Sequence, residues 1–146
     1  MKGFKTKSSL AYKMAVPGGR TVAAAVAAAE LALASHRDEG MAQIGLTLGR
    51  LEAACDARDP AAQASVYDLA AALLDLAGFF ETGPLFPAAF SLCDLSDRMM
   101  TDNVWTWPSI TVHVHAMRLL LADDCKESTA STLLLQGLAA LSRHRT

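Results

Sequence analysis

The residues from 22 to 55 follow a helical period over a long stretch. Small or mostly apolar residues recur there at steps of three or four positions, at Val22, Val26, Ala29, Leu33, His36, Gly40, Ile44, Leu48, Leu51 and Cys55. Such steps place side chains on one face of an α-helix, which has about 3.6 residues per turn. The pattern predicts one continuous helix over 20–58, and two helices with a break at Asp38-Glu39-Gly40 are the alternative.

Short signals mark where the following helices begin. Asp59-Pro60 combines an N-cap residue with proline at the first helical position. Thr82-Gly83-Pro84 ends the second helix and starts a third, which carries Phe86 and Phe90 among its apolar residues. A fourth helix is expected over 108–122, and Ser128 is expected to cap a fifth.

The connections between these segments are short, so consecutive helices should be antiparallel neighbours. Apolar residues make up 52% of the chain, and Ala and Leu, both good helix formers, supply most of them. No segment alternates apolar and polar residues as a half-buried strand does. The sequence therefore predicts an all-α antiparallel bundle with a four-helix core plus a long N-terminal helix. The bundle is expected to be one domain over 20–146, preceded by a flexible leader over 1–19.

Charge and cysteine content narrow the possible surroundings and partners. The formal net charge is −2, so there is no overall basic field to attract nucleic acid. Three widely spaced cysteines, Cys55, Cys93 and Cys125, form neither a disulfide framework nor a zinc clip, and reduced thiols are typical of the cytosol. The alanine-rich run over 22–29 imitates a secretory signal, but Glu30 interrupts it, and no apolar run approaches the roughly 20 residues that span a bilayer. We expect a cytoplasmic protein that binds neither nucleic acid nor a membrane.

The histidines and methionines do not indicate a metal or cofactor site. His113 and His115 are two positions apart on a helix, so their side chains point about 200° apart and cannot share one ion. We expect His113 to be partly buried with a hydrogen-bond partner, and His115 to face solvent beside Arg118. Methionines at helical spacing are usually core residues. No metal ligand and no cofactor is therefore predicted.

No nucleophile has an evident base nearby in the sequence. Ser91 and Ser109 lack a flanking catalytic signature, and Cys93 is followed by Asp94, whose charge raises rather than lowers a thiol pKa. No catalytic residue is therefore predicted, and the chain is not expected to be an enzyme.

The segment 67–95 carries the most information about function. It reads Tyr-Asp-Leu-Ala-Ala-Ala-Leu-Leu-Asp-Leu-Ala-Gly-Phe-Phe over 67–80, followed by Leu85, Ala88-Ala89 and Leu92-Cys93-Asp94-Leu95. This hairpin resembles that of histidine-containing phosphotransfer domains, in which one helix carries a phospho-accepting histidine, a lysine and small residues including Ala-Gly. The alanine-rich start, His36-Arg37 and the segment 112–120 also resemble small helical proteins of bacterial chemotaxis gene clusters.

The chain departs from the phosphotransfer pattern at its reacting position. The histidine position falls on Ala71, or on Ala72 in the neighbouring register, and the lysine position falls on Leu74. The resemblance therefore implies a four-helix bundle that keeps the docking surface for a response-regulator receiver domain and lacks the transfer chemistry. It implies a partner-binding patch around Ala71, Leu74, Asp75 and Gly78.

Two other functions are compatible with the sequence. The long stripe over 22–55 exceeds what one small bundle covers, so the chain is alternatively a structural homodimer that buries the excess, with Trp105 and Trp107 in the contact. The chain is otherwise a phosphocarrier that uses His113 or His115.

Overall fold

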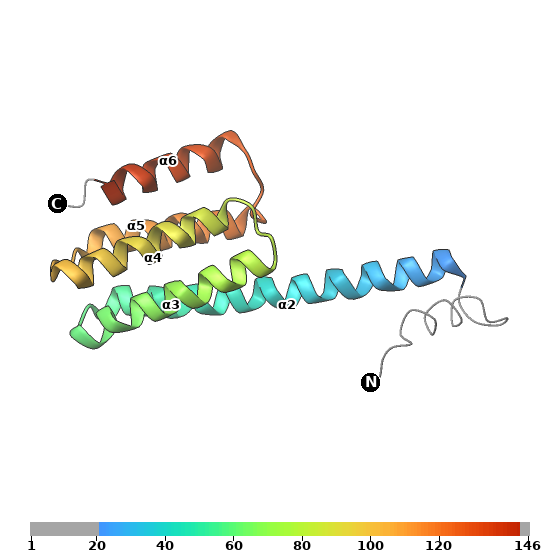
Figure 1. Cartoon of the computed structure of the whole chain (residues 1–146), viewed down its shortest axis with the longest axis horizontal. Coiled ribbons are helices and arrows are strands. Elements are labelled where there is room, and N and C mark those ends of the chain that lie inside the picture. Colours follow the sequence, from blue (N-terminus) through green and yellow to red (C-terminus); the bar gives the residue numbers. More distant parts are fainter. Residues whose placement is uncertain (1–20, 144–146) are drawn as a thin grey trace. The chain divides into compact units, whose positions relative to one another are not determined.

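The computed structural model describes residues 21–143 (Figure 1). Five α-helices and no strand occur in that part of the chain, which confirms the predicted all-α class. They are α2 (Val22–Ala57), α3 (Pro60–Phe79), α4 (Leu85–Asp102), α5 (Trp107–Ala122) and α6 (Thr129–Arg143). The helix predicted over 20–58 is continuous, without a break at Gly40. The leader predicted over 1–19 lies outside the described residues.

The chain divides into two compact units between Glu39 and Gly40, within α2. In the first unit, the backbone N–H of Ala24 donates a 3.0 Å hydrogen bond to Oγ1 of Thr21, which caps the start of α2. The long apolar side chains of this unit, Val22, Val26, Leu31 and Leu33, are exposed. The predicted stripe is therefore buried only from Gly40 onward.

The second unit, over 40–143, holds the hydrophobic core. Figure 1 shows it in layers, with the second half of α2 beside α3, then α4 beside α5, and α6 on the outside, packed on α4 and α5. The largest fully buried apolar side chains come from every one of these helices, namely Ile44, Leu48, Leu51, Leu73, Leu85, Leu92, Leu95, Met99, Ile110, Met117 and Leu138. Alanines are among the buried residues of both α3 and α4, at Ala62, Ala70 and Ala77 and at Ala88 and Ala89, and small side chains allow close helix approach.

The helix ends follow from local hydrogen bonds. Oδ1 of Asp59 accepts a 2.8 Å hydrogen bond from the backbone N–H of Ala62, which starts α3 beside Pro60. Ser128 and Ser131 bond reciprocally, each side-chain oxygen accepting from the backbone N–H of the other residue at 3.1 and 2.9 Å. This reciprocal pairing is a capping box, and it starts α6 as the sequence predicts.

Polar contacts join helices that are distant in sequence. Arg118 of α5 donates to both carboxylate oxygens of Glu52 in α2, at 3.0 and 2.9 Å. Arg98 of α4 donates to the hydroxyl of Ser142 in α6, and also pairs with Asp94 one turn earlier at 2.9 Å. These contacts fix α2 against α5 and α4 against α6 within the second unit.

Candidate partner-binding site

The four residues predicted to bind a partner lie together on one face of α3. Their spacing of three, four and seven positions from Ala71 to Leu74, Asp75 and Gly78 follows the helical period. Asp75 and Gly78 are exposed, while Ala71 and Leu74 are partly buried. The patch is therefore open to solvent and borders the α3–α4 contact.

Helix α4 completes this surface. A Cβ atom added to Gly78 would lie 3.1 Å from Cε1 of Phe86, so the Phe86 ring packs directly over the glycine. Further along, the side chains of Tyr67 and Cys93 share a hydrogen bond. Phe86, Phe90 and Cys93 follow steps of four and three, so they share one face of α4.

We call this surface the α3–α4 face. It consists of Tyr67, Ala71, Leu74, Asp75 and Gly78 of α3, and of Phe86, Phe90, Cys93 and Asp97 of α4.

Exposed phenylalanines are the most unusual feature of the α3–α4 face. The exposed fractions of Phe86 and Phe90 are 42% and 56%, and that of Phe79, at the end of α3, is 78%. Aromatic rings grouped in an exposed patch commonly mark a protein interface. Sequence reasoning named Phe86 and Phe90 only as apolar residues of their helix. The available signal in the sequence was that the face with Phe86 and Phe90 continues with Cys93 and Asp97, whereas the buried face of α4 is apolar except for Ser96.

Carboxylates dominate the charge around the face. Helices α3 and α4 carry five aspartates, Asp68, Asp75, Asp94, Asp97 and Asp102, against a single basic residue, Arg98. Asp94 is already paired with Arg98, so Asp75 and Asp97 are the carboxylates that the face itself presents. A complementary partner surface would combine apolar side chains with lysine or arginine.

The Cys93 thiol does not have the character of a reactive nucleophile. Burial raises its pKa, and the hydrogen bond from Tyr67 only partly opposes this. In turn, the neighbouring Cys93 is the largest influence that raises the pKa of Tyr67. A thiol with a raised pKa is mostly protonated near neutral pH, and the thiolate is the nucleophilic form. Cys93 therefore contributes to the face as a weakly polar packing residue.

His113 is fully buried rather than partly buried, and both of its ring nitrogens are hydrogen-bonded. Nδ1 lies 2.8 Å from the carbonyl oxygen of Ser109, to which it donates, and Nε2 lies 2.8 Å from Oγ of Ser91. Nε2 therefore accepts from the Ser91 hydroxyl, which joins α5 to α4. Sequence reasoning assigned Ser91 no base and missed this pair, because the two residues are 22 positions apart.

The surroundings of the Ser91–His113 pair favour a role in helix packing over a role in catalysis. Burial lowers the pKa of His113, with the hydrogen bond to Ser109 opposing this in part, so the ring is neutral near pH 7. Ser91 lies inside α4, where the neighbouring backbone N–H groups are used by the helix itself. Those groups are not free to stabilise an oxyanion beside Ser91. His115, by contrast, is exposed as predicted.

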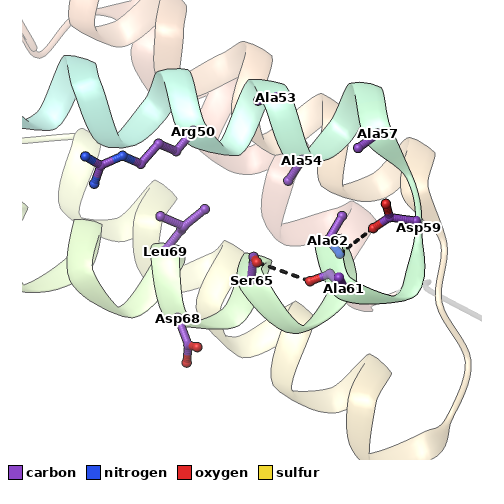
Figure 2. A pocket seen from close by; sticks show the side chains of 10 residues that line it. All are labelled: Arg50, Ala53, Ala54, Ala57, Asp59, Ala61, Ala62, Ser65, Asp68 and Leu69. Atoms are coloured by element: carbon purple, nitrogen blue, oxygen red, sulfur yellow. Dashed lines mark hydrogen bonds between the residues drawn. The ribbon is translucent and has the colours of Figure 1, made fainter.

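An alanine-lined cleft separates the end of α2 from the start of α3. Figure 2 shows small side chains along it, Ala53, Ala54 and Ala57 on one wall and Ala61 and Ala62 on the other, around a cavity of about 550 Å³. At its Asp59 end the polar groups are already bonded, because Asp59 accepts from Ala62 and Ser65 donates to the Ala61 carbonyl at 3.1 Å. Asp59 and Ser65 are therefore already bonded to backbone groups of α3 at this end of the cleft.

Neither a metal-binding cluster nor a membrane-spanning helix occurs within residues 21–143. No group of three or more His, Cys, Asp or Glu side chains in that range has the arrangement of a metal site. None of the helices in it combines the length and apolar character needed to cross a bilayer. Met99 and Met117 are buried in the core, whereas Met100 is 47% exposed.

Comparisons with known protein families, with curated proteins and with solved structures find no match to this chain.

Proposed function

We propose that the chain is a non-catalytic, cytoplasmic protein-interaction module of two-component or chemotaxis signalling, and that its α3–α4 face binds a receiver domain. The observation that supports this most is the exposure of Phe86 and Phe90 on one face of α4, with the Phe86 ring over Gly78 of α3. Burying such rings on a partner removes apolar surface from water, at about 25 cal/mol per Å². Within one copy of the chain, this surface stays exposed.

The shape of the face suits a helical or loop element of the partner. On α3 the face is low at Ala71 and Gly78, which are small, while Phe86 and Phe90 lie on its α4 side. A partner element can therefore lie along α3 with its apolar side chains against the two rings. Asp75 and Asp97 then meet basic residues at the rim, which favours a correct encounter more than it adds affinity.

The direct test is calorimetric titration with receiver domains encoded in the same genome. Phe90→Ala should weaken binding by about 30-fold, because a central aromatic anchor contributes about 2 kcal/mol or more. Leu46→Ala is a matched control, since Leu46 lies on α2 with an exposed fraction of 59%, close to that of Phe90. The proposal fails if no receiver domain binds, or if both variants lose affinity equally.

A second experiment separates docking from phosphoryl transfer. Incubation with a phosphorylated receiver domain should leave no acid-labile label on the wild-type protein, whose α3–α4 face carries no imidazole. The double variant Ala71→His with Leu74→Lys places a histidine and a lysine at the positions where phosphotransfer domains have them, and should gain the label. Label on His113 or His115 of the wild type would instead identify a phosphocarrier.

A further inference from the structure

Helices α5 and α6 border an open apolar groove on the surface of the second unit. The groove encloses about 870 Å³, and among its lining residues are Val112, Ala116 and Leu119 of α5 and Leu133 and Gly137 of α6. Val112, Leu119 and Leu133 have exposed fractions of 49%, 55% and 61%. A single copy therefore leaves three large apolar side chains in water along one groove.

Gly137 gives the groove a low floor at its middle. A Cβ atom added there would meet no atom within 4 Å, so packing within one copy does not require glycine. Glycine inside a helix costs about 1 kcal/mol relative to alanine. A backbone from outside that approaches α6 closely would account for a glycine at this position.

The same chain carries a helix of suitable chemistry in its first unit. Val22, Val26, Ala29 and Leu33 are spaced by four, three and four positions, which aligns them in one narrow stripe. Val22, Val26 and Leu33 have exposed fractions of 61%, 48% and 69%. The other residues from 22 to 34 are alanine except Glu30 and Leu31, so the helix is thin over most of its length and can enter a groove.

The lengths of this helix and of the groove also agree. At about 1.5 Å per residue, the segment 22–39 is about 27 Å long, and the 15 residues of α6 span about 22 Å. An amphipathic helix that lies in an apolar groove, anchored at intervals of three and four residues, is a common mode of recognition.

We infer that the α5–α6 groove binds the segment 22–39 of a second copy of this chain, and that the exchange is reciprocal. Reciprocity follows from two-fold symmetry, in which each copy supplies one helix and one groove. A stable interface buries about 1,600 Å² in total, so each of the two contacts has to bury about 800 Å². In each contact the helix and the groove then bury about 400 Å² each, an area that a helix of 18 residues can provide.

Sedimentation velocity of the full chain over a range of concentrations tests the inference. The wild type should dimerise, and Leu33→Glu and Leu133→Glu should each raise the dissociation constant about 30-fold or more, because either places a charge in the apolar contact. Leu46→Glu is the matched control on an exposed part of α2 and should dimerise normally. A wild type that stays monomeric overturns the inference, as does a dimer that tolerates both groove-contact variants.

A pair of glycine variants tests the close approach without adding charge. Gly137→Leu should weaken the dimer, because its side chain fills the floor of the groove. Gly49→Leu is matched to it, since a Cβ at Gly49 of α2 also meets no atom within 4 Å, and it should leave the dimer intact. Equal effects of the two substitutions would contradict the assignment of the groove.

Cysteine cross-linking identifies which segments meet. In a Cys93→Ser background, protein with Val26→Cys is mixed with protein with Leu133→Cys under mild oxidation. We expect disulfide-linked pairs between the two species. If these pairs are absent and the Val26→Cys protein forms linked pairs with itself, the segments 22–39 of two copies contact each other, and the assignment of the groove is wrong. Leu33, Leu133 and Gly137 lie outside the α3–α4 face, so receiver binding and dimer formation can fail independently in variants at these positions. Cys93→Ser does change that face, and it is used only for the cross-linking.

Discussion

At the scale of single residues, protonation of His113 would destabilise the fold. Its ring has no solvent exposure, and its Nε2 lone pair accepts from Ser91. Protonation would turn that acceptor into a donor in a buried site and leave a charge there. The native state therefore holds His113 neutral at pH values where the unfolded chain already binds a proton.

This difference predicts a loss of stability in mild acid. Burial lowers the pKa of His113 below its usual 6.5, so below about pH 6.5 the unfolded state binds up to one proton more than the native state. The free energy of unfolding should then fall by up to about 1.4 kcal/mol per pH unit. Urea titrations between pH 5.0 and 7.5, above the range where carboxylates dominate, measure this. His115→Gln, at an exposed position, should keep the slope, and a stability that stays flat over this range would contradict the prediction.

Gly40 is a second residue whose role follows from one contact. A Cβ atom at this position would lie 2.5 Å from the Phe80 ring, whereas a Cβ at Gly49 meets nothing within 4 Å. Gly49→Ala should therefore stabilise the protein by about 0.5–1 kcal/mol through helix propensity alone. Gly40→Ala has to displace the ring, and should be about 1–2 kcal/mol less stable than Gly49→Ala. Thermal and urea unfolding of the two variants check this, and equal stabilities would show that Phe80 moves aside freely.

At the scale of helices, the start of α3 depends on its cap. Asp59 accepts the hydrogen bond from Ala62, and α3 has no acidic residue in its first turn that could replace it. Asp59→Ala should cost about 1 kcal/mol of stability. Asp56→Ala removes a nearby exposed carboxylate with no role in that cap, and should change stability by less than about 0.5 kcal/mol. Urea unfolding measures both, and the prediction is wrong if the two substitutions cost the same.

The same helix ends show what can be predicted from sequence. Asp59-Pro60 and Ser128 act through hydrogen bonds to residues three positions away, so a local pattern is enough to find them. Burial along α2 and α4 is harder to foresee. The period of a helix shows which residues share a face, but not whether another helix covers that face, and Val26, Leu33 and Phe90 are all exposed.

For the candidate site, too, the sequence predicts which residues share a helix face but not which residues of other helices they contact. The spacing of Ala71, Asp75 and Gly78 is enough to place them on one face of α3, because it follows the helical period. Their relation to Phe86, and the pairing of Ser91 with His113, depend on how α3, α4 and α5 pack. Contacts between residues this far apart in sequence leave no local signature, so they follow only from the tertiary arrangement.

At the scale of the whole molecule, the two proposed surfaces do not share residues. The α3–α4 face draws on Phe86 and Phe90, and the groove draws on α5 and α6. A reciprocal dimer would therefore present two α3–α4 faces, and a partner that is itself dimeric would bind it with a higher apparent affinity than it binds a single copy.

The stoichiometry of the receiver complex then gives a prediction that combines both surfaces. With a monomeric receiver domain, the wild type should form a complex of two copies of each chain. Leu133→Glu should give a one-to-one complex with an unchanged dissociation constant per site, because its substitution is remote from Phe90. Light scattering coupled to size-exclusion chromatography measures the mass, and calorimetry measures the affinity. If Leu133→Glu instead abolishes receiver binding while the protein stays folded, the partner-binding surface requires the dimer, and the independence of the two surfaces is wrong.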